Sequence, residues 1–405
     1  MTTTEPATTT VVAPSVVTAD DTRKRRLIRG VLVAASIWAV THIGAQLAAA
    51  LAVAIHTPQL LAQPWSFFTL LVHWDAANYR NVAQFGYFSE GAGPFAHAFL
   101  PGYPFVSRFL AEALFVTVSP TAVQIDVALW TVTAVAALVA ACLLWFLVEP
   151  QYGRRVAFGS VALLLAGPYA LFLVAPYPEA LYLVPAIGAW LAMRNERWVI
   201  AGLLACFAGT IRIETVFLVP ALIVLFAVQR HREGLPWLTR AIGFGAISAV
   251  GLTSYLLWLW HRTGNIRAWF DVEEAGWHRS TRWPWETFAR SLEYATSPAT
   301  VRAGHIQAWA DIVFVVLYLI AIVMFIRLRW WAEAVYIGLS TVSMATSYAY
   351  TSMARESTTL FPLTILVALT LRTRRWRWVF WVVLVLSALI MFAQAGRFAL
   401  DDWSD

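Results

Sequence analysis

The sequence predicts an all-α membrane protein that crosses the bilayer many times. Hydrophobic residues make up 60% of the chain and charged residues only 13%, which leaves too little polar surface to cover a soluble protein of 405 residues. The apolar residues form long runs without the alternation of a strand. Because lipid offers the backbone no hydrogen-bond partners, such runs cross as helices. The net charge of +6 does not indicate nucleic-acid binding, since its meaning depends on which loops hold the basic residues.

The amino-terminal residues 1–29 are expected to form a disordered cytoplasmic arm. They are rich in Thr, Val, Ala and Pro without helical periodicity, and they end in a basic collar of Arg23, Lys24, Arg25, Arg26 and Arg29. A basic collar before apolar residues is also typical of a cleaved secretory signal. The apolar run 31–55 is too long for such a signal, so the sequence favours an uncleaved membrane anchor.

The remaining residues, 30–405, are predicted to form one transmembrane domain with about 11 helical spans. These lie near residues 31–55, 121–148, 156–175, 180–193, 199–211, 214–229, 241–261, 309–326, 332–350, 357–371 and 378–395. Several are shorter than the roughly 20 residues that a perpendicular crossing needs. Broken or re-entrant helices are therefore expected near residues 176–178 and near Arg212.

The positions of the basic residues predict how these spans are oriented. With the amino terminus in the cytoplasm, the arm and the inner loops hold 18 of the 29 basic residues. Those inner loops are residues 149–155, 194–198, 229–240, 327–331 and 372–377. Two large loops, residues 56–120 and 262–308, then face outward together with the acidic residues 401–405. The many tryptophans near these loops are typical of an aromatic belt, and stacking on carbohydrate is a second interpretation.

The most informative segment is residues 73–87, where a carboxylate follows the first apolar span. If residues 76–87 are helical, Tyr79, Val82 and Ala83 share one face, as in an interfacial amphipathic helix. Asp75 then lies at the start of this helix. It either caps the helix by accepting backbone N–H groups, or acts as a general base that takes a proton from an acceptor hydroxyl.

Three motifs resemble the PIG-V-like family of mannosyltransferases that build glycosylphosphatidylinositol anchors, together with their bacterial relatives. The first combines Trp74 and Asp75 with Tyr79, Ala83, Gly86 and Tyr87. The second is the run Ala98, Phe99, Leu100, Pro101, Gly102, Tyr103 and Pro104, and the third spans residues 175–182 around Glu179. Arg212 is a weaker fourth similarity. The chain departs from the family pattern at Pro178, Ile213 and Glu214.

The resemblance implies a GT-C fold and inverting transfer of mannose from a polyprenyl-phosphate donor, without a nucleotide sugar. It implies that Asp75 is the catalytic base. The residues expected to bind substrate are Trp74, Tyr79, Arg80, Tyr87, His97, Tyr103, Glu179, Arg212 and Arg355. The acceptor would be linked to lipid, glycan or protein, on the outer face of the cell membrane.

A departing lipid phosphate needs cations at the outer interface. The arginines nearest the predicted outer span ends are Arg80, Arg108, Arg212 and Arg355, and the last two rank first because each interrupts apolar sequence. Residues two apart cannot share a helical face, so Arg212 and Glu214 are each expected to need a partner on another helix. Arg355 is expected to pair with Glu179 or with the phosphate, although Glu179 also suits a helix cap.

The sequence holds no metal-binding motif, and we expect neither a metal nor a cofactor. The expected partners are the lipid-linked sugar donor, a lipid or glycan acceptor and membrane lipids, with no nucleic acid. Two alternatives stay open: an enzyme of the same fold that uses another polyprenyl-phosphate sugar, and a transporter or flippase of a lipid-linked intermediate. Transport needs a polar path across the bilayer, whereas the charges here gather at the outer side, which favours an enzyme.

Overall fold

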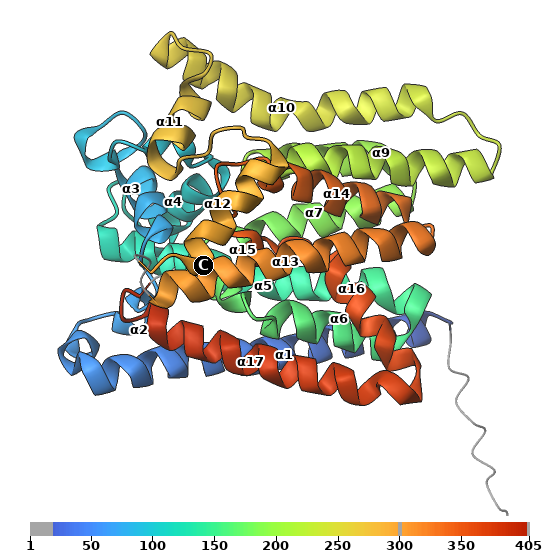
Figure 1. Ribbon diagram of the computed structural model, residues 1–405, viewed down its shortest axis with the longest axis horizontal. Helices are drawn as coiled ribbons and strands as arrows, with labels where there is room; N and C mark the ends of the chain where they lie inside the picture. The colour runs from blue at the N-terminus through green and yellow to red at the C-terminus, as the bar shows by residue number, and fades with distance from the viewer. Residues whose placement is uncertain (1–18, 299–301, 403–405) are drawn as a thin grey trace, which may run out of the picture.

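The computed structural model describes residues 19–298 and 302–402, and every regular element in these ranges is a helix. Helices from most of the chain lie side by side in one bundle (Figure 1). They are α1 (Ala19–His56), α5 (Ala122–Tyr152), α6 (Arg154–Ala166), α7 (Glu179–Arg194), α8 (Trp198–Gly209), α9 (Thr215–Arg232), α10 (Leu238–Thr263), α13 (Arg302–Arg327), α14 (Trp331–Ala345), α16 (Pro362–Ala368) and α17 (Arg377–Phe398).

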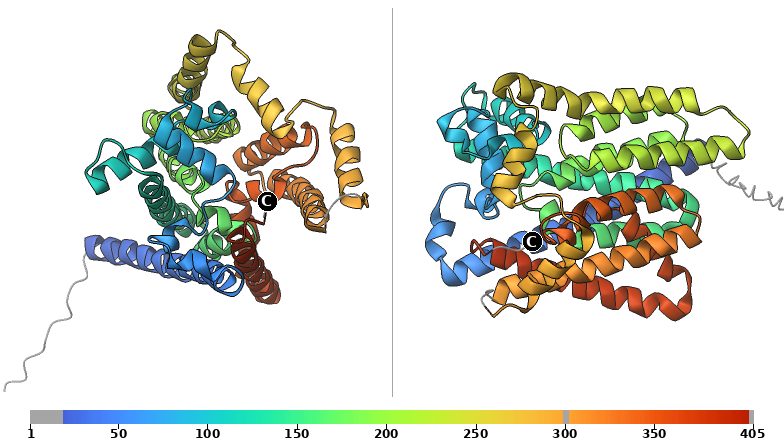
Figure 2. Two further views of the ribbon diagram at one scale, coloured as in Figure 1. Left: turned by 90° about the vertical axis from the view of Figure 1, so that its left-hand side faces the viewer. Right: turned by 45° about the horizontal axis from the view of Figure 1, so that its top comes forward.

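Further helices, from two distant parts of the chain, gather at one end of this bundle (Figures 1 and 2). They are α2 (Ser66–Thr69), α3 (Asp75–Phe85), α4 (Gly102–Phe115), α11 (Ala268–Trp277) and α12 (Pro284–Thr296). The carboxyl-terminal residues reach the same end, because His73 Nδ1 lies 3.1 Å from Asp401 Oδ1. The two loops that the sequence predicts on one side of the membrane therefore do share one end of the molecule.

In the described part of the chain, six helices are long and apolar enough to cross a membrane, so the chain is a polytopic helical membrane protein. They are Lys24–His56, Ala122–Tyr152, Thr215–Arg232, Leu238–Thr263, Gly304–Arg327 and Arg374–Phe398. Each of the predicted spans overlaps a helix, but three helices are shorter than predicted: α6 ends at Ala166, α14 ends at Ala345 and α16 begins at Pro362. The count of about 11 crossings stays a prediction.

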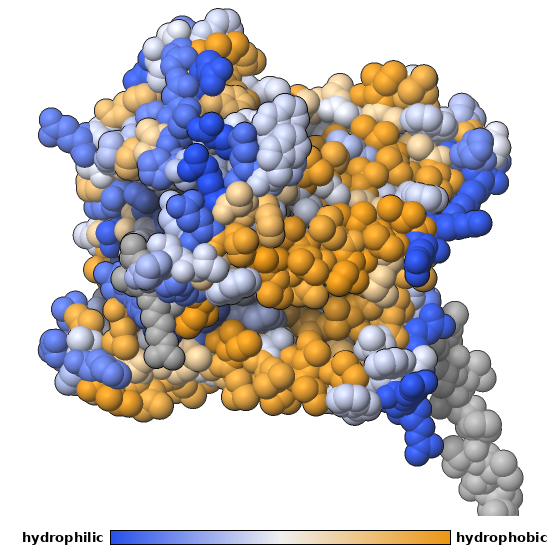
Figure 3. All heavy atoms as spheres, in the orientation of Figure 1, coloured by the Kyte–Doolittle hydropathy of each residue, from blue (hydrophilic) through white to orange (hydrophobic). Residues whose placement is uncertain are grey.

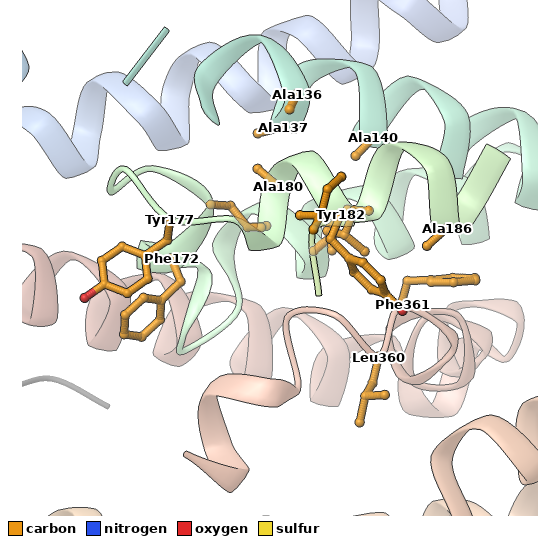
Figure 4. Close-up of a cluster of buried hydrophobic side chains, with 14 of the residues drawn as sticks. Ala136, Ala137, Ala140, Phe172, Tyr177, Ala180, Tyr182, Ala186, Leu360 and Phe361 are labelled. Atoms are coloured by element: carbon orange, nitrogen blue, oxygen red, sulfur yellow. The ribbon is translucent and has the colours of Figure 1, made fainter. Parts of the chain in front are cut away.

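On the face shown in Figure 3, hydrophobic side chains cover the middle of the bundle and separate two more polar ends. Within the bundle, α5 is the most buried of the six candidate spans. Of its most apolar 18-residue stretch, 61% is buried, against 22% to 33% in the other five. Three of its alanines, Ala136, Ala137 and Ala140, are buried close to Ala180 of α7 (Figure 4). Small residues let two membrane helices approach closely, which holds the start of α7 in a fixed place.

Two irregular segments enter the end of the bundle that carries α3. The first, residues 167–178, contains the 3-10 helix η4 (Ala170–Leu173) and confirms the predicted break near residues 176–178. The second, residues 346–361, contains the four-residue helix α15 (Met353–Glu356). Buried irregular backbone needs hydrogen-bond partners. Helix α13 supplies them, since Asp311 Oδ1 accepts the N–H of Ala354 at 3.0 Å and the Tyr318 hydroxyl donates to the Met353 carbonyl.

The predicted arm covers residues 1–29, and its first 18 residues lie outside the described part of the chain. From Ala19 onward the chain is helical, so the basic collar belongs to the first turns of α1 rather than to an arm. The collar residue Arg26 donates to Glu149 near the end of α5, with Nε and Oε2 2.7 Å apart. The remaining short elements are the 3-10 helices η1 (Pro58–Ala62), η2 (Glu90–Ala92), η3 (Ala96–Ala98), η5 (Leu369–Arg372) and η6 (Arg374–Trp376).

Candidate active site

Helix α3 presents Asp75 as its first residue, one position before the start that the sequence predicts. The predicted apolar face is confirmed, because Tyr79, Val82 and Ala83 are all buried. Trp74 precedes the helix with a φ of 55°, a backbone region that non-glycine residues rarely adopt. This turn starts the helix abruptly and places the Asp75 side chain at the end of the bundle.

The irregular segment before α7 supports this turn. The Tyr177 hydroxyl donates to the backbone carbonyl of His73 at 3.3 Å, and the same carbonyl accepts the N–H of Ala76 at 3.1 Å. Tyr177 is fully buried and packs edge-on against Phe172, which lies in the same segment (Figure 4). The position of Asp75 thus depends on residues about a hundred positions further along the chain.

Arg355 of α15 contacts the carboxylate of Asp75. Its Nη1 lies 3.3 Å from Asp75 Oδ2, and its Nε and Nη2 lie 2.8 and 2.7 Å from Glu179 Oε1. The guanidinium also stacks over the rings of Phe172 and Tyr177, at 4.5 and 4.7 Å from their centroids. The carboxylates contact the edge of the planar guanidinium and the aromatic rings contact its face, and together these contacts fix its orientation. The expected pairing of Arg355 with Glu179 is confirmed.

Arg212 lies in the turn between α8 and α9 and is surrounded by carboxylates. Its guanidinium donates to Glu179 at 2.8 Å, to Glu214 at 3.0 Å and to Glu356. The prediction that Arg212 and Glu214 cannot pair with each other is wrong. It assumed a continuous helix, whereas this turn is not helical and both side chains point to the same side. The prediction of partners elsewhere in the fold is confirmed by Glu179 and Glu356.

These side chains form one carboxylate–arginine network, made of Asp75, Glu179, Arg212, Glu214, Arg355 and Glu356. It is largely buried: the side chains of both arginines are 9% exposed and that of Glu179 is 0% exposed. Four acids outnumber two bases, so the network has a formal charge of −2. Burial raises the pKa of Glu356, and the nearby Arg212 opposes that rise.

A cavity of about 90 Å³, which we call the site cavity, adjoins this network. Asp75, Arg212, Glu214, Arg355 and Glu356 line one part of it, together with Tyr79. The second large loop contributes Trp269, Glu273, Trp277 and Arg279, and the first large loop contributes Ala98, Phe99 and Leu100. Ile211, Ile213 and Ser352 complete the lining. Aromatic rings beside carboxylates and arginines are the side chains that sugar and phosphate ligands contact. Among the described residues, no cluster of His, Cys, Asp and Glu is arranged to hold a metal ion.

A second hollow of about 470 Å³, which we call the side groove, continues from the site cavity. The two share seven lining residues: Ile213, Glu214, Trp269, Glu273, Arg279, Ser352 and Glu356. Beyond these, the side groove runs between α9 and α10 on one side and α14 on the other. Its apolar lining residues are Val216, Phe217, Leu252, Leu256, Phe270 and Met344, and its hydroxyl-bearing ones are Ser280, Thr281, Ser340, Ser343, Thr346, Ser347 and Thr351. The groove therefore extends from the charged site cavity to a space between membrane helices that has an apolar wall on α9 and α10.

The structure brings some of the predicted site residues together and leaves others apart. Asp75, Tyr79, Glu179, Arg212 and Arg355 meet at the site cavity or directly beneath it. Five others are not among its described lining residues: Trp74, Arg80, Tyr87, His97 and Tyr103.

Those five have other surroundings. Arg80 lies 3.5 Å from Asp126 of α5, and the hydroxyls of Tyr87 and Tyr103 donate to the carbonyls of Phe99 and Leu129. Trp74 is exposed. His97 stacks beside Phe88, and burial lowers its pKa. The further cation Arg108 pairs with Glu112 and donates to carbonyls at the end of α3. Most of these contacts hold the first loop together.

Sequence reasoning missed several residues of the site cavity. Glu214 and Glu356 line the cavity, but the sequence indicated them only as residues close in sequence to Arg212 and Arg355. The other missed residues belong to the second large loop, which has no recognised motif: Trp269, Glu273, Trp277 and Arg279. One signal pointed to the last group: the second large loop is rich in Trp and Arg and was predicted to lie on the same side as Asp75. Pairing the two loops in space required the fold.

Comparison with known proteins assigns the family. A family model described as Mannosyltransferase (PIG-V) matches residues 24–258, more than half of the chain. The match covers α3, α7 and the turn that carries Arg212, and hence Asp75, Glu179 and Arg212 of the network. No curated protein matches the chain. With this match, an all-helical membrane bundle and an acidic site at one end, the chain belongs to the PIG-V family of mannosyltransferases.

Proposed function

We propose that the protein moves mannose from a polyprenyl-phosphate donor to an acceptor hydroxyl, with inversion at the sugar carbon, on the outer face of the cell membrane. The acceptor is linked to lipid, glycan or protein. One observation carries this proposal: Asp75 lines a charged cavity that is continuous with a groove between membrane helices, and one wall of that groove is apolar. Such a hollow suits a substrate with a sugar at one end and a long lipid at the other.

Asp75 is the general base of this proposal. The acceptor oxygen forms a bond to the sugar carbon C1, on the face opposite the phosphate. The C1–O bond to the phosphate breaks, and the phosphate leaves with the electron pair. The acceptor proton passes to the Asp75 carboxylate, whose side chain is 18% exposed and lines the site cavity.

Arg355 acts as a positioning residue for Asp75. Its guanidinium is held by Glu179 and by two aromatic rings, so the contact with Asp75 comes from a fixed group. Arg212 in turn holds three carboxylates near the cavity. Both arginines were predicted as ligands of the departing phosphate. The N–H groups of both guanidinium groups already donate to carboxylates, so a different cation is needed to contact the phosphate directly.

The outer face is inferred from charge. The loops rich in arginine, such as residues 229–237 and 372–377, lie at the end of the bundle opposite α3 (Figure 1). Basic loops stay on the cytoplasmic side of membrane proteins, so the end with Asp75 faces outward. The network lies at this one end, while packed alanines of α5 and α7 occupy the middle of the bundle. This arrangement favours an enzyme over a transporter, which needs a polar path through the middle.

The test uses purified protein, radiolabelled polyprenyl-phosphate mannose and a membrane extract as the source of acceptor. We expect Asp75→Asn to lower kcat by about 10²- to 10⁴-fold while donor binding is kept. Asp271→Asn is the matched control, because Asp271 lies on α11, pairs with Arg267 and is 49% exposed. Equal turnover by wild type and Asp75→Asn would remove Asp75 from the mechanism.

Donors with other sugars test the rest of the proposal. Polyprenyl-phosphate glucose, galactose and arabinose are offered to the wild-type protein beside the mannose donor, and inversion is read from the anomeric configuration of the product. Faster transfer of another sugar would overturn the donor assignment. No transfer from any of these donors, combined with movement of the donor across vesicles, would indicate a transporter.

A further inference from the structure

We propose that the side groove holds the prenyl chain of the donor and that Arg279 binds its phosphate. This inference rests on the proposed function and extends it to a specific lipid site. The occupant is a polyprenyl phosphate, a long apolar chain that ends in an anion. Charge, exposure and continuity with the site cavity each support this choice.

Arg279 is the accessible cation of the site. Three arginines are among the described residues that line the site cavity, and the side chain of Arg279 is 44% exposed, whereas those of Arg212 and Arg355 are each 9% exposed. Its ion pair with Glu273 is loose, with 3.4 Å between Nη1 and Oε2. An exposed guanidinium with a weak partner retains donors for a phosphate.

The position of Arg279 matches the two parts of the ligand. It lines both the site cavity and the side groove, so a phosphate bound there has the sugar on the side of Asp75 and the lipid on the side of α14. The adjacent residues Ser280, Thr281 and Ser352 also line the groove and bring hydroxyl groups to its polar end. The apolar residues follow further along, toward the membrane helices.

Part of the apolar lining of the side groove is exposed on the surface of the bundle. Val216 of α9 and Phe270 of α11 line it and are 42% and 54% exposed. The two flanking helices, α9 and α10, also expose most of their apolar residues. Only 33% and 28% of their most apolar 18-residue stretches are buried. In a bilayer such exposed apolar surface contacts acyl chains, so a prenyl chain can enter the groove sideways without crossing water.

The charge of the phosphate changes during the reaction in a way that uses this cation. In the donor the phosphate is a diester with one negative charge. When the C1–O bond breaks, the phosphate becomes a monoester and gains a second acidic oxygen. A guanidinium within contact distance stabilises the added charge in the transition state, in addition to binding the donor.

Direct binding of radiolabelled polyprenyl phosphate to the purified full-length protein tests the inference. We expect Arg279→Ala to weaken binding by about 10- to 100-fold, the usual effect of losing a hydrogen bond to a charged group. Arg267→Ala is the matched control, since Arg267 is also an arginine beside α11 paired with an acid, is 72% exposed and is absent from the described lining of both hollows. Equal affinity of wild type and Arg279→Ala would overturn the inference.

A second variant examines the groove itself. Ser343 of α14 is exposed and lines the side groove, so Ser343→Trp narrows it. We expect the KM for a long-chain donor to rise at least several-fold, with little change for a donor whose prenyl chain is too short to reach α14. Equal changes for both donors, or none for either, would overturn the assignment of the groove. If wild type binds polyprenyl phosphate through Arg279 but transfers no mannose, the proposed function fails and this inference stands.

Discussion

Arg355 and Glu179 lie 176 positions apart in the chain, yet Arg355 Nη2 is 2.7 Å from Glu179 Oε1. The same oxygen also accepts from Arg212 at 2.8 Å, so one buried carboxylate joins two arginines from different parts of the fold. Among the described residues, the other oxygen of Glu179 is buried without a hydrogen-bond partner. The two guanidinium groups offset the desolvation cost of this buried carboxylate.

Loss of Glu179 should destabilise the protein strongly. Glu179→Ala leaves two buried guanidinium groups without a shared counter-charge, and we expect a loss of about 3–5 kcal/mol in the free energy of unfolding. Glu112→Ala removes the partly exposed pair with Arg108 and should cost less than about 1 kcal/mol. Chemical unfolding in detergent measures both. Similar losses for the two variants would contradict the structural role of Glu179.

Replacement of Arg355 separates positioning from phosphate binding. In Arg355→Lys a single ammonium cannot reproduce the bonds to both Asp75 and Glu179 or the stacking on Phe172 and Tyr177. We expect kcat to fall by at least about tenfold, the effect of a small displacement of a catalytic group, while the donor KM changes little. Steady-state kinetics with the labelled donor checks this split. A rise in KM at unchanged kcat would instead identify Arg355 as a phosphate ligand, as the sequence suggested.

Donor affinity should depend on pH through Glu273. Burial raises the pKa of this carboxyl; Glu214 and Asp75 reinforce the rise, and Arg279 and Arg212 oppose it. As the pH falls through this raised pKa, Glu273 takes up a proton and loses its negative charge. Arg279 then loses its competing partner, so the donor KM should fall with falling pH. Glu273→Gln should give the low KM at every pH, and a dependence that persists in this variant would contradict the assignment.

A glycine of the first loop should influence the turn that carries Arg212. The N–H of Gly102 donates to the Thr210 carbonyl at 2.7 Å, and a side-chain carbon at Gly102 would lie 2.6 Å from the Thr210 hydroxyl and 2.7 Å from Ile211. We expect Gly102→Ala to displace this turn, to cost about 1–3 kcal/mol of stability and to lower kcat. Gly245→Ala is the control, because a side-chain carbon there would meet no neighbouring atom of the described residues within 4 Å. Thermal unfolding and initial rates measure the outcome.

The local features of the site were predictable from sequence, whereas its assembly was not. The buried face of α3 follows from apolar spacing, and the break before Glu179 follows from two prolines. The pairing of Arg355 with Glu179 could be predicted because a buried charge needs a partner of opposite charge. The bond between Arg212 and Glu214 was missed because spacing rules assume a helix, and the turn is not helical.

Residues whose partners lie far along the chain were also misjudged. Tyr103 belongs to a recognisable motif, yet its hydroxyl bonds to Leu129 and Thr133 of α5 and it is fully buried. Arg279 had no motif at all. Its exposure depends on how the second large loop lies over α14, which only tertiary packing determines. Motifs therefore pointed to the first loop without separating the residues that line the site cavity from those that support them.

The contact between Asp75 and Arg355 joins positions 280 residues apart, which has a consequence for biosynthesis. A nascent chain inserts its first helices, with Asp75, Glu179 and Arg212 already made, long before the ribosome reaches α15. During that interval Asp75 and Glu179 lack the guanidinium of Arg355, which both contact in the finished fold. Premature termination anywhere before residue 355 would therefore leave a species that insertion machinery and membrane proteases recognise as unfinished, rather than a weak enzyme.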